Sequence, residues 1–197
     1  MIKTIKENYY MVIKIILNQL GMDFFGIVMF IAGSSAGMGE GREHIGSIAK
    51  IATSVFAILF YMVLLYTMSK DEGLKDEIRI ESGRMKPQPL KFLWLSLAAN
   101  VVNILLGIIV TVGTVMGANA PGFVVDAVTV AIGGITLTEG MYLGVLQEVF
   151  NMNGFACILI AAPAIITCTL GYYIGSQGGF SKMMEKKAKK LEEKENK

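Results

Sequence analysis

A charged segment with a long uncharged apolar run on each side is the feature that most constrains this fold. Ser69 to Lys91 carries six Lys or Arg and five Asp or Glu residues. Residues 52–68 before it and 92–116 after it contain no charged residue. Each run is about as long as a helix needs to cross a hydrocarbon core ~30 Å thick. Because a charged block between two such runs is expected in water, the three segments predict a membrane hairpin.

The composition supports a membrane protein. Hydrophobic residues make up 53% of the 197 residues, which is too apolar for an ordinary soluble domain. The net charge is only +2, and no long basic face forms on a foldable soluble element, which argues against nucleic-acid binding. We therefore expect the lipid bilayer as partner, one transmembrane domain over residues 1–180, and a lysine-rich tail over 181–197.

The apolar runs predict an all-α polytopic bundle with four transmembrane helices. The N-terminal run resembles a signal peptide, but Asn18, Gln19 and Asp23 interrupt it, so a retained first span is preferred. Pro163 lies near the middle of the last span and is expected to kink it, with Thr167 as a partner for the freed carbonyl group through a water molecule. The four spans are expected at about residues 13–36, 47–68, 92–116 and 155–174.

The outer segment 117–153 is the hardest to assign. It is moderately apolar and contains acidic residues but no Lys or Arg. One spanning helix through it would carry Asp126 or Glu139 near the middle of the membrane, and would place the lysine-rich tail outside. The alternative is a pair of short interfacial or re-entrant helices broken at Gly133-Gly134. We expect these helices at about 123–133 and 137–151.

The basic residues predict which side of the membrane each segment faces. Three Lys lie at the N-terminus, six Lys or Arg lie in the charged hairpin 69–91, and seven Lys lie in the tail. The outer segments hold only Arg42 and Lys50. By the positive-inside rule, both termini face the cytoplasm of a multi-pass cell-membrane protein. Aromatic residues gather near the same boundary, as expected for an interfacial belt: Tyr9, Tyr10, Tyr66, Trp94, Tyr172 and Tyr173.

Four polar residues within two spans form a candidate site. Asp23 and Asn100 lie at similar depths, ~12–15 Å from the cytoplasmic boundary. Gln19 is one helical turn from Asp23, and Asn103 is one turn from Asn100. The functional hypothesis is a cation or proton site, or the lining of a substrate or ion path. The structural alternative is interhelical hydrogen bonding, worth ~0.6–2 kcal/mol per contact; it is favoured for the asparagines, whereas both remain open for Asp23.

Signatures of catalysis and of metal binding are missing from the sequence. There is no HExxH, no Gly-x-Ser-x-Gly, no P-loop and no Cys-x-x-Cys. The only histidine, His44, lies in a short polar turn without a second His or Cys nearby. Cys157 and Cys168 lie ~16 Å apart along one helix, too far to form a disulfide. We therefore expect no enzyme activity, no cofactor and no metal.

Three short patches carry a resemblance to a family. The first is Leu17 to Gly21 with Phe24 to Gly26; the second is Leu64 to Thr67 with Lys75-Asp76 and Gly83-Arg84; the third is Gly171 to Gly175. These patches resemble a set of uncharacterised small membrane proteins from Gram-positive bacteria. The resemblance implies a bacterial four-span integral membrane protein and implies no activity.

Two functions are compatible with these features. The first is a non-enzymatic accessory or structural membrane component, which would act within a larger membrane complex. The second is a small transporter or channel that uses the polar cluster around Asp23. Four spans can hardly enclose a path alone, so the second hypothesis includes a homo-oligomer.

Overall fold

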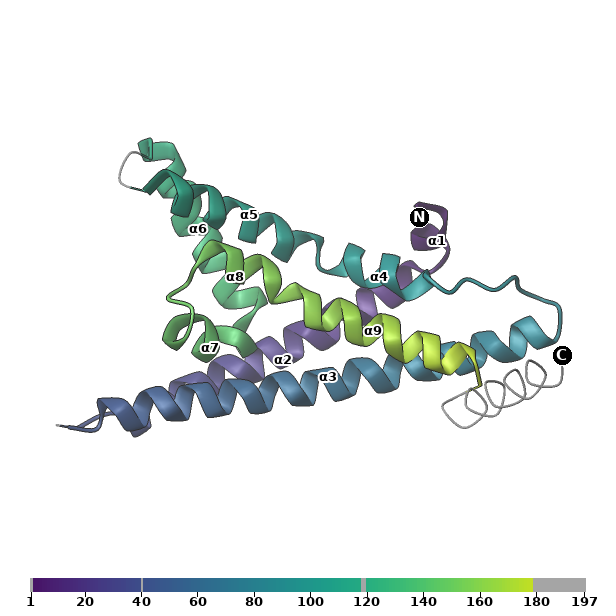
Figure 1. Ribbon diagram of the computed structural model, residues 1–197, viewed down its shortest axis with the longest axis horizontal. Coiled ribbons are helices and arrows are strands. Elements are labelled where there is room, and N and C mark those ends of the chain that lie inside the picture. Colours follow the sequence, from purple (N-terminus) through teal and green to yellow (C-terminus); the bar gives the residue numbers. More distant parts are fainter. Residues whose placement is uncertain (1, 40, 118–119, 179–197) are drawn as a thin grey trace, which may run out of the picture.

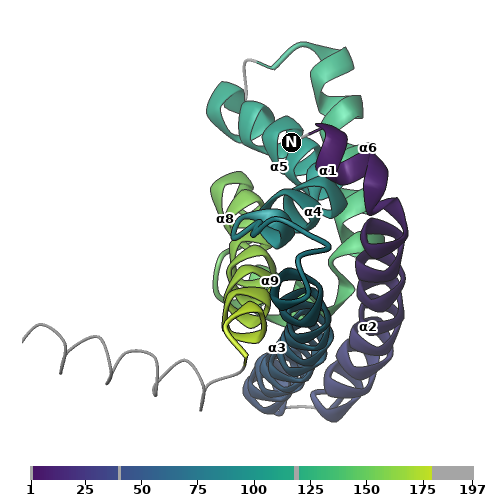
Figure 2. The ribbon, with the colours of Figure 1, turned by 90° about the vertical axis from the view of Figure 1, so that its right-hand side faces the viewer.

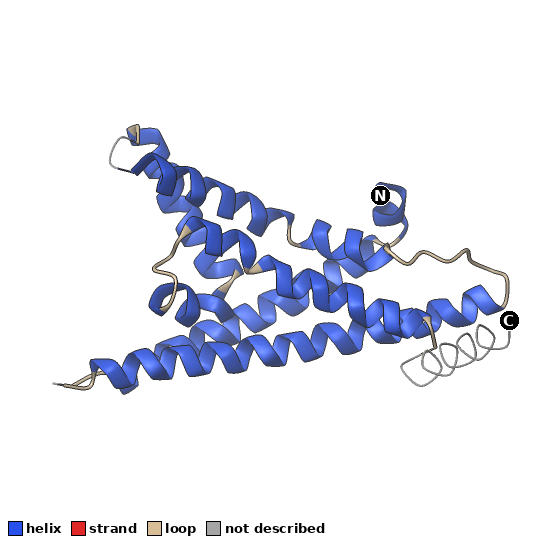
Figure 3. Ribbon diagram, viewed as in Figure 1, coloured by secondary structure: helices blue, strands red, loops and turns tan. Residues whose placement is uncertain are grey.

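The computed structural model describes residues 2–39, 41–117 and 120–178, and every regular element in these ranges is a helix (Figures 1 and 3). Three helices are long and apolar enough to cross a membrane, and up to five spans result if each of two bent pairs counts as one. The chain is thus a membrane-embedded helical protein. The predicted tail 181–197 lies outside the described residues. The helices are α1 (Ile2–Glu7), α2 (Tyr9–Ala36), α3 (Glu43–Glu81), α4 (Lys91–Ala99), α5 (Val101–Met116), α6 (Gly122–Thr138), η2 (Gly140–Tyr142), α7 (Leu143–Glu148), α8 (Gly154–Leu159) and α9 (Ala161–Ser176).

The two longest helices, α2 and α3, form an antiparallel hairpin, seen lengthwise along the lower part of Figure 1. Their axes approach closely because small residues face each other near the turn. A side chain added at Gly37 would meet Gly46, and one added at Gly33 would meet the backbone of Ala49 and Lys50. Close helix approach through small residues is typical of packing in membranes.

Helix α3 continues beyond the predicted end of the second span at residue 68 and reaches Glu81. The first part of the charged block 69–91 is therefore helical, and some of its charged side chains are buried against the bundle. Asp76 is fully buried, and its carboxylate accepts hydrogen bonds from Lys91 Nζ at 2.6 Å, from Arg79 Nη1 at 3.0 Å and from Tyr172 OH at 3.0 Å. A buried carboxylate is tolerated because charged and hydroxyl donors compensate for its lost hydration.

The last span, predicted at 155–174, consists of α8 and α9, which together form a candidate span of 23 residues. The break at Ile160 lies one residue after the carbonyl group that Pro163 leaves without its helical partner. Thr167 Oγ1 donates to Met62 Sδ at 3.2 Å. α9 packs along α3, and Gly171 and Gly175 lie against the α3 backbone.

The third span, predicted as one helix over 92–116, is divided at Asn100 into α4 and α5 with a bend of 55°. The Asn100 side chain donates through Nδ2 to Ser96 O at 2.9 Å. Asparagine side chains compete with the backbone in this way and so weaken a helix interior. As a result α4 stays with the bundle and α5 diverges from it, as the two views show (Figures 1 and 2).

The segment 117–153 does contain two helical arms, but their break is not where we predicted it. α6 continues through Gly133-Gly134, and the chain bends by 91° at Glu139 instead. α6 runs back along α5, because Gly113 lies beside Val128 and Gly134 beside Leu106. α7 then turns toward the beginning of α3, where Lys50 Nζ binds Glu148 Oε1 at 2.9 Å.

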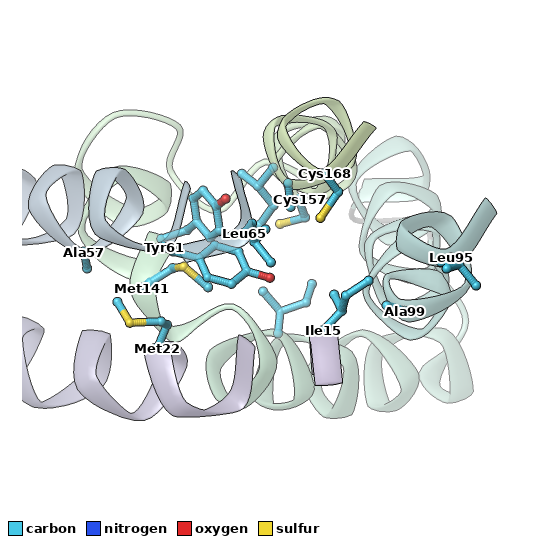
Figure 4. Close-up of a cluster of buried hydrophobic side chains, with 14 of the residues drawn as sticks. Ile15, Met22, Ala57, Tyr61, Leu65, Leu95, Ala99, Met141, Cys157 and Cys168 are labelled. Carbon is cyan, nitrogen blue, oxygen red and sulfur yellow. The ribbon is translucent and has the colours of Figure 1, made fainter. Parts of the chain in front are cut away.

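The apolar core lies between α2, α3, α4, η2 and the α8–α9 span (Figure 4). Tyr61 and Leu65 of α3 meet Ile15 of α2 and Met141 of η2 there, and all four are at most 1% exposed. Cys157 and Cys168 are also buried in this core as free thiols. The apolar core thus packs around Met141 and Tyr142, which follow directly after the bend at Glu139.

Helix α2 offers a matched pair of glycines for testing the packing of the bend. A Cβ atom at Gly26 would clash with the backbone of Gly140 and Met141, whereas a Cβ at Gly21 would meet nothing within 4 Å. We expect Gly26→Ala to lower the free energy of unfolding by ~1–3 kcal/mol, the usual effect of overpacking. Gly21→Ala should be neutral or stabilising by up to ~1 kcal/mol. Thermal unfolding in detergent, followed by circular dichroism, measures both; equal Tm values for the two variants would contradict this packing.

Candidate functional site

Four polar side chains meet at the bend between α6 and η2, and we call them the carboxyl cluster: Gln19, Asp23, Asn103 and Glu139. Each is at most 5% exposed. Gln19 Nε2 donates to Thr138 O at 2.9 Å and to Glu139 Oε1 at 3.4 Å. The Asn103 side chain also hydrogen-bonds the Glu139 carboxyl group. Glu139 therefore joins α2 to α5 at the point where the chain changes direction.

Within the carboxyl cluster, Asp23 lies beside Glu139, and only part of the hydrogen-bonding capacity of its carboxyl group is used. Its Oδ1 accepts a hydrogen bond of 3.5 Å from the backbone N–H of Met141, whereas its Oδ2 is buried and has no hydrogen-bond partner among the residues that the structure describes. Asp23 and Glu139 lie close enough to interact electrostatically. Within the described ranges neither carboxyl group forms an ion pair. Burying such charges without compensation is costly, so the carboxyl cluster favours a cation or a proton.

Three of the four residues chosen from the sequence, Gln19, Asp23 and Asn103, lie in the carboxyl cluster. Asn100 is buried, but the hydrogen bond that it donates goes to Ser96 of its own helix at the α4–α5 bend. Glu139 was missed as a site residue, because an acid at mid-membrane counted against a helix there. The signal was present in the Glu139-Gly140 pair between two apolar stretches, since non-helical backbone inside a membrane is found where a cavity or a site requires it.

Two tyrosines extend the polar character of this region toward the core. The hydroxyl groups of Tyr61 and Tyr142 are buried and have no hydrogen-bond partner among the described residues. Tyr61 lies close enough to Tyr142 and Glu139 to interact electrostatically. In Figure 4, Tyr61 lies among apolar core residues near Met141. Buried polar groups are nearly always paired, so hydroxyl groups left in this state indicate water or a ligand beside them.

A small cavity gives access to the carboxyl cluster from the side of the bundle. Its volume is about 140 Å³, and it opens between α2, the α4–α5 pair and α6. Gln19, Asn103 and Thr138 supply its polar wall. The remaining lining is apolar: Ile16, Leu20, Ala99 and Val102. Two members of the carboxyl cluster, Gln19 and Asn103, therefore border a cavity at the side of the bundle.

The side chains of the carboxyl cluster offer two carboxyl groups and two amide groups. The described residues contain no group of three or more His, Cys, Asp or Glu side chains that could hold a metal ion. Comparisons with protein-family models, curated proteins and solved structures found no match for this chain. The resemblance to small membrane proteins of Gram-positive bacteria stays a prediction.

Gln19 can be tested against its neighbour in the sequence. Gln19→Met would remove the amide that donates to Thr138 and Glu139 and leave buried acceptors without a donor, at a cost of ~1–3 kcal/mol. Asn18 is half-buried and donates only to Met68 Sδ at 3.4 Å, so Asn18→Met should change stability by less than ~0.5 kcal/mol. Thermal unfolding of the two variants in detergent compares them. A Tm for Gln19→Met no lower than that for Asn18→Met would show that the amide does not support the bend.

Proposed function

We propose that this chain is a four-span protein of a bacterial cell membrane with both termini in the cytoplasm. In this topology α2, α3, α4–α5 and α8–α9 cross the membrane, and α6 to α7 form a re-entrant hairpin that enters and leaves on the outer side. The distribution of Lys and Arg supports this topology. Arg42 and Lys50 are the only such residues near the proposed outer end of the bundle. Tyr10 and Tyr172 support it too, because their hydroxyl groups bind Glu72 and Asp76 at the end of the bundle with the basic residues.

Reporter fusions test this topology. A phosphatase or fluorescent-protein reporter fused after Asp126 should report the outer side, and one fused after Ser181 should report the cytoplasm. A five-span arrangement predicts an outer location for the fusion after Ser181. Either reversal of the expected signals would overturn the four-span proposal.

We further propose that the protein is a small oligomeric transporter or channel that works through the carboxyl cluster. The observation that carries this proposal is the burial of Asp23 and Glu139 at a helix break within the apolar part of the bundle, where the described part of the chain gives neither carboxyl group a cationic partner. Ionisable residues at such depth are expensive and mark ion or substrate paths. Broken helices near mid-membrane are also where transporters bind substrates and coupling ions.

The role of each residue follows from its contacts. Asp23 and Glu139 supply the negative charge that attracts a cation or proton. Gln19 and Asn103 hold the Glu139 carboxyl group in place through their hydrogen bonds. The α6–α7 hairpin carries Glu139 and lies against α2 and α3 through Gly140 and Gly144, so a shift of the hairpin would change the environment of both carboxyl groups together. A path bounded by four spans requires a second copy for its remaining wall.

Flux measurements test this proposal with a matched acid outside the cluster. The purified protein is reconstituted into liposomes, and proton, Na⁺ and K⁺ movements are followed with internal dyes under an imposed gradient. We expect flux of at least one of these ions, and we expect Asp23→Asn and Glu139→Gln to reduce it to background. Asp126 lies exposed on α6, so Asp126→Asn should leave the flux unchanged. Absence of flux from the folded wild-type protein, or equal flux in all variants, would contradict the proposal.

A second candidate function is that of a non-enzymatic accessory component of a larger membrane complex. The divergence of α5 and α6 from the bundle favours it (Figure 2). Their outward apolar side chains, such as Val102, Leu105 and Val130, are 54–74% exposed and are available to a partner helix as well as to lipid. Recovery of a different membrane protein in fixed proportion from mild detergent would support this function, whereas a homo-oligomer of defined mass would support the first.

A further inference from the structure

A second cavity, larger and more apolar, lies on the other side of the bend. We call it the apolar groove; it has a volume of about 600 Å³ and lies between α3, the η2–α7 arm and the α8–α9 span. It exists because α7 and α8 are joined by a short turn that separates them while both pack on larger helices. The lining residues are Ile58, Tyr142, Val145, Val149, Phe150, Asn153, Phe155, Ala156, Leu159, Ile160 and Pro163.

The apolar groove is open toward the surroundings of the bundle. Phe155 and Leu159 on its rim are 58% and 67% exposed. Ile58 on its inner wall lies within the uncharged run 52–68 of α3, so the groove lies at the depth of the hydrocarbon core. A buried water needs two to four polar partners, and Tyr142 and Asn153 are the polar side chains among the lining residues, so most of the groove does not suit water. The amide oxygen of Asn153 is already used, since it accepts from Phe155 N at 2.9 Å.

We propose that the apolar groove binds one acyl chain of a membrane lipid. An unfilled apolar groove loses the dispersion contacts of its walls, and its volume lies within the range of ~300–1,000 Å³ typical of ligand sites. A helix from a second copy of the chain, ~10 Å across with its side chains, is the other occupant that an apolar groove could hold, and the test below separates the two. An alkyl chain is favoured because the groove lies at the depth of the hydrocarbon core, where lipid chains surround the protein.

The polar groups around the groove orient the lipid. The turn from Val149 to Asn153 lies at the end of α7, next to the ion pair between Lys50 and Glu148. The lipid headgroup therefore lies beside this turn, where polar partners are present, and its chain extends toward Tyr142. Tyr142 is three residues after Glu139, so the bound chain abuts the arm that carries the carboxyl cluster. Lipid binding here is independent of the proposed transport, because no residue of the carboxyl cluster lines the groove.

Photo-crosslinking tests the proposal. The protein is reconstituted into phosphatidylcholine vesicles that contain a trace of phosphatidylcholine with a diazirine in its acyl chain, and adducts are located by mass spectrometry. We expect adducts to concentrate on peptides from 142 to 163, relative to equally exposed apolar residues of α5. Val145→Phe adds bulk to the groove wall and should reduce these adducts about tenfold, equivalent to ~1.4 kcal/mol. Leu105→Phe makes the same kind of change on the exposed face of α5 and should have no effect.

Two results would overturn the proposal. One is equal labelling of the groove and of α5 in the wild-type protein, which would indicate ordinary surrounding lipid only. The other is crosslinking of two protein copies through groove residues without lipid adducts, which would identify a second copy as the occupant. If Val145→Phe does not fold, Val149→Phe replaces it, because Val149 lies on the rim of the groove and is 51% exposed. Unreduced labelling in a folded groove variant counts against the proposal.

Discussion

The backbone break between α6 and η2 is the constraint on which the rest of this structure depends. Inside a membrane, non-helical backbone is tolerated only where protein covers it or a water-filled cavity satisfies it. Here the neighbouring helices cover it. Gln19 donates to the carbonyl oxygen of Thr138, Asp23 accepts from the N–H of Met141, and Ser54 Oγ accepts from the N–H of Gly144 at 2.9 Å. Both α2 and α3 must therefore approach the break closely, and glycines at the contacts allow them to.

The buried carboxylate of Asp76 holds the opposite end of the bundle together. Its partners come from three different elements, since Lys91 begins α4, Tyr172 lies on α9 and Arg79 lies on α3 itself. The ring of Phe92 stacks on Tyr172 with a centroid distance of 4.9 Å and adds an apolar contact. Removing one partner from such a network would leave a buried charge uncompensated, which is strongly unfavourable. α4 is thereby fixed to α3 and α9, so the bend at Asn100 moves α5 and leaves α4 in place.

The sequence predicts those parts of the structure that depend on the length of an apolar run and on the position of a residue along a span. Helical character, the approximate spans and the gathering of Gln19, Asp23 and Asn103 follow from run length and from residue position along each span. The extension of α3 to Glu81 could not be predicted in this way, because the high charge density of residues 69–91 suggested a solvated hairpin. Its local signal is the i,i+3 pairing of Glu72 with Lys75 and of Asp76 with Arg79.

The partners of Glu139 could not be predicted for a different reason. The cost of an acid at mid-membrane argues against placing one there, and that cost is real. It is met by contacts with Gln19 and Asn103, which come from α2 and α5, far away in the sequence. No local pattern in residues 117–153 reveals such partners. A site assembled from three helices is visible only when their packing is known.

The distribution of charge along the bundle gives the two ends of the carboxyl cluster different surroundings. Toward the end with Asp76, a cation would meet Lys91 and Arg79 and then an apolar layer that includes Leu65 and Leu95. Toward the end where α7 stops, Lys50 is neutralised by Glu148, and no Lys or Arg occurs between residues 92 and 181. Desolvation in the apolar layer therefore opposes the approach of a cation from the end with Asp76. In the proposed transporter, this arrangement favours entry of a cation at the end where the α6–α7 hairpin begins and finishes, and the hairpin that carries Glu139 forms the wall of the path there.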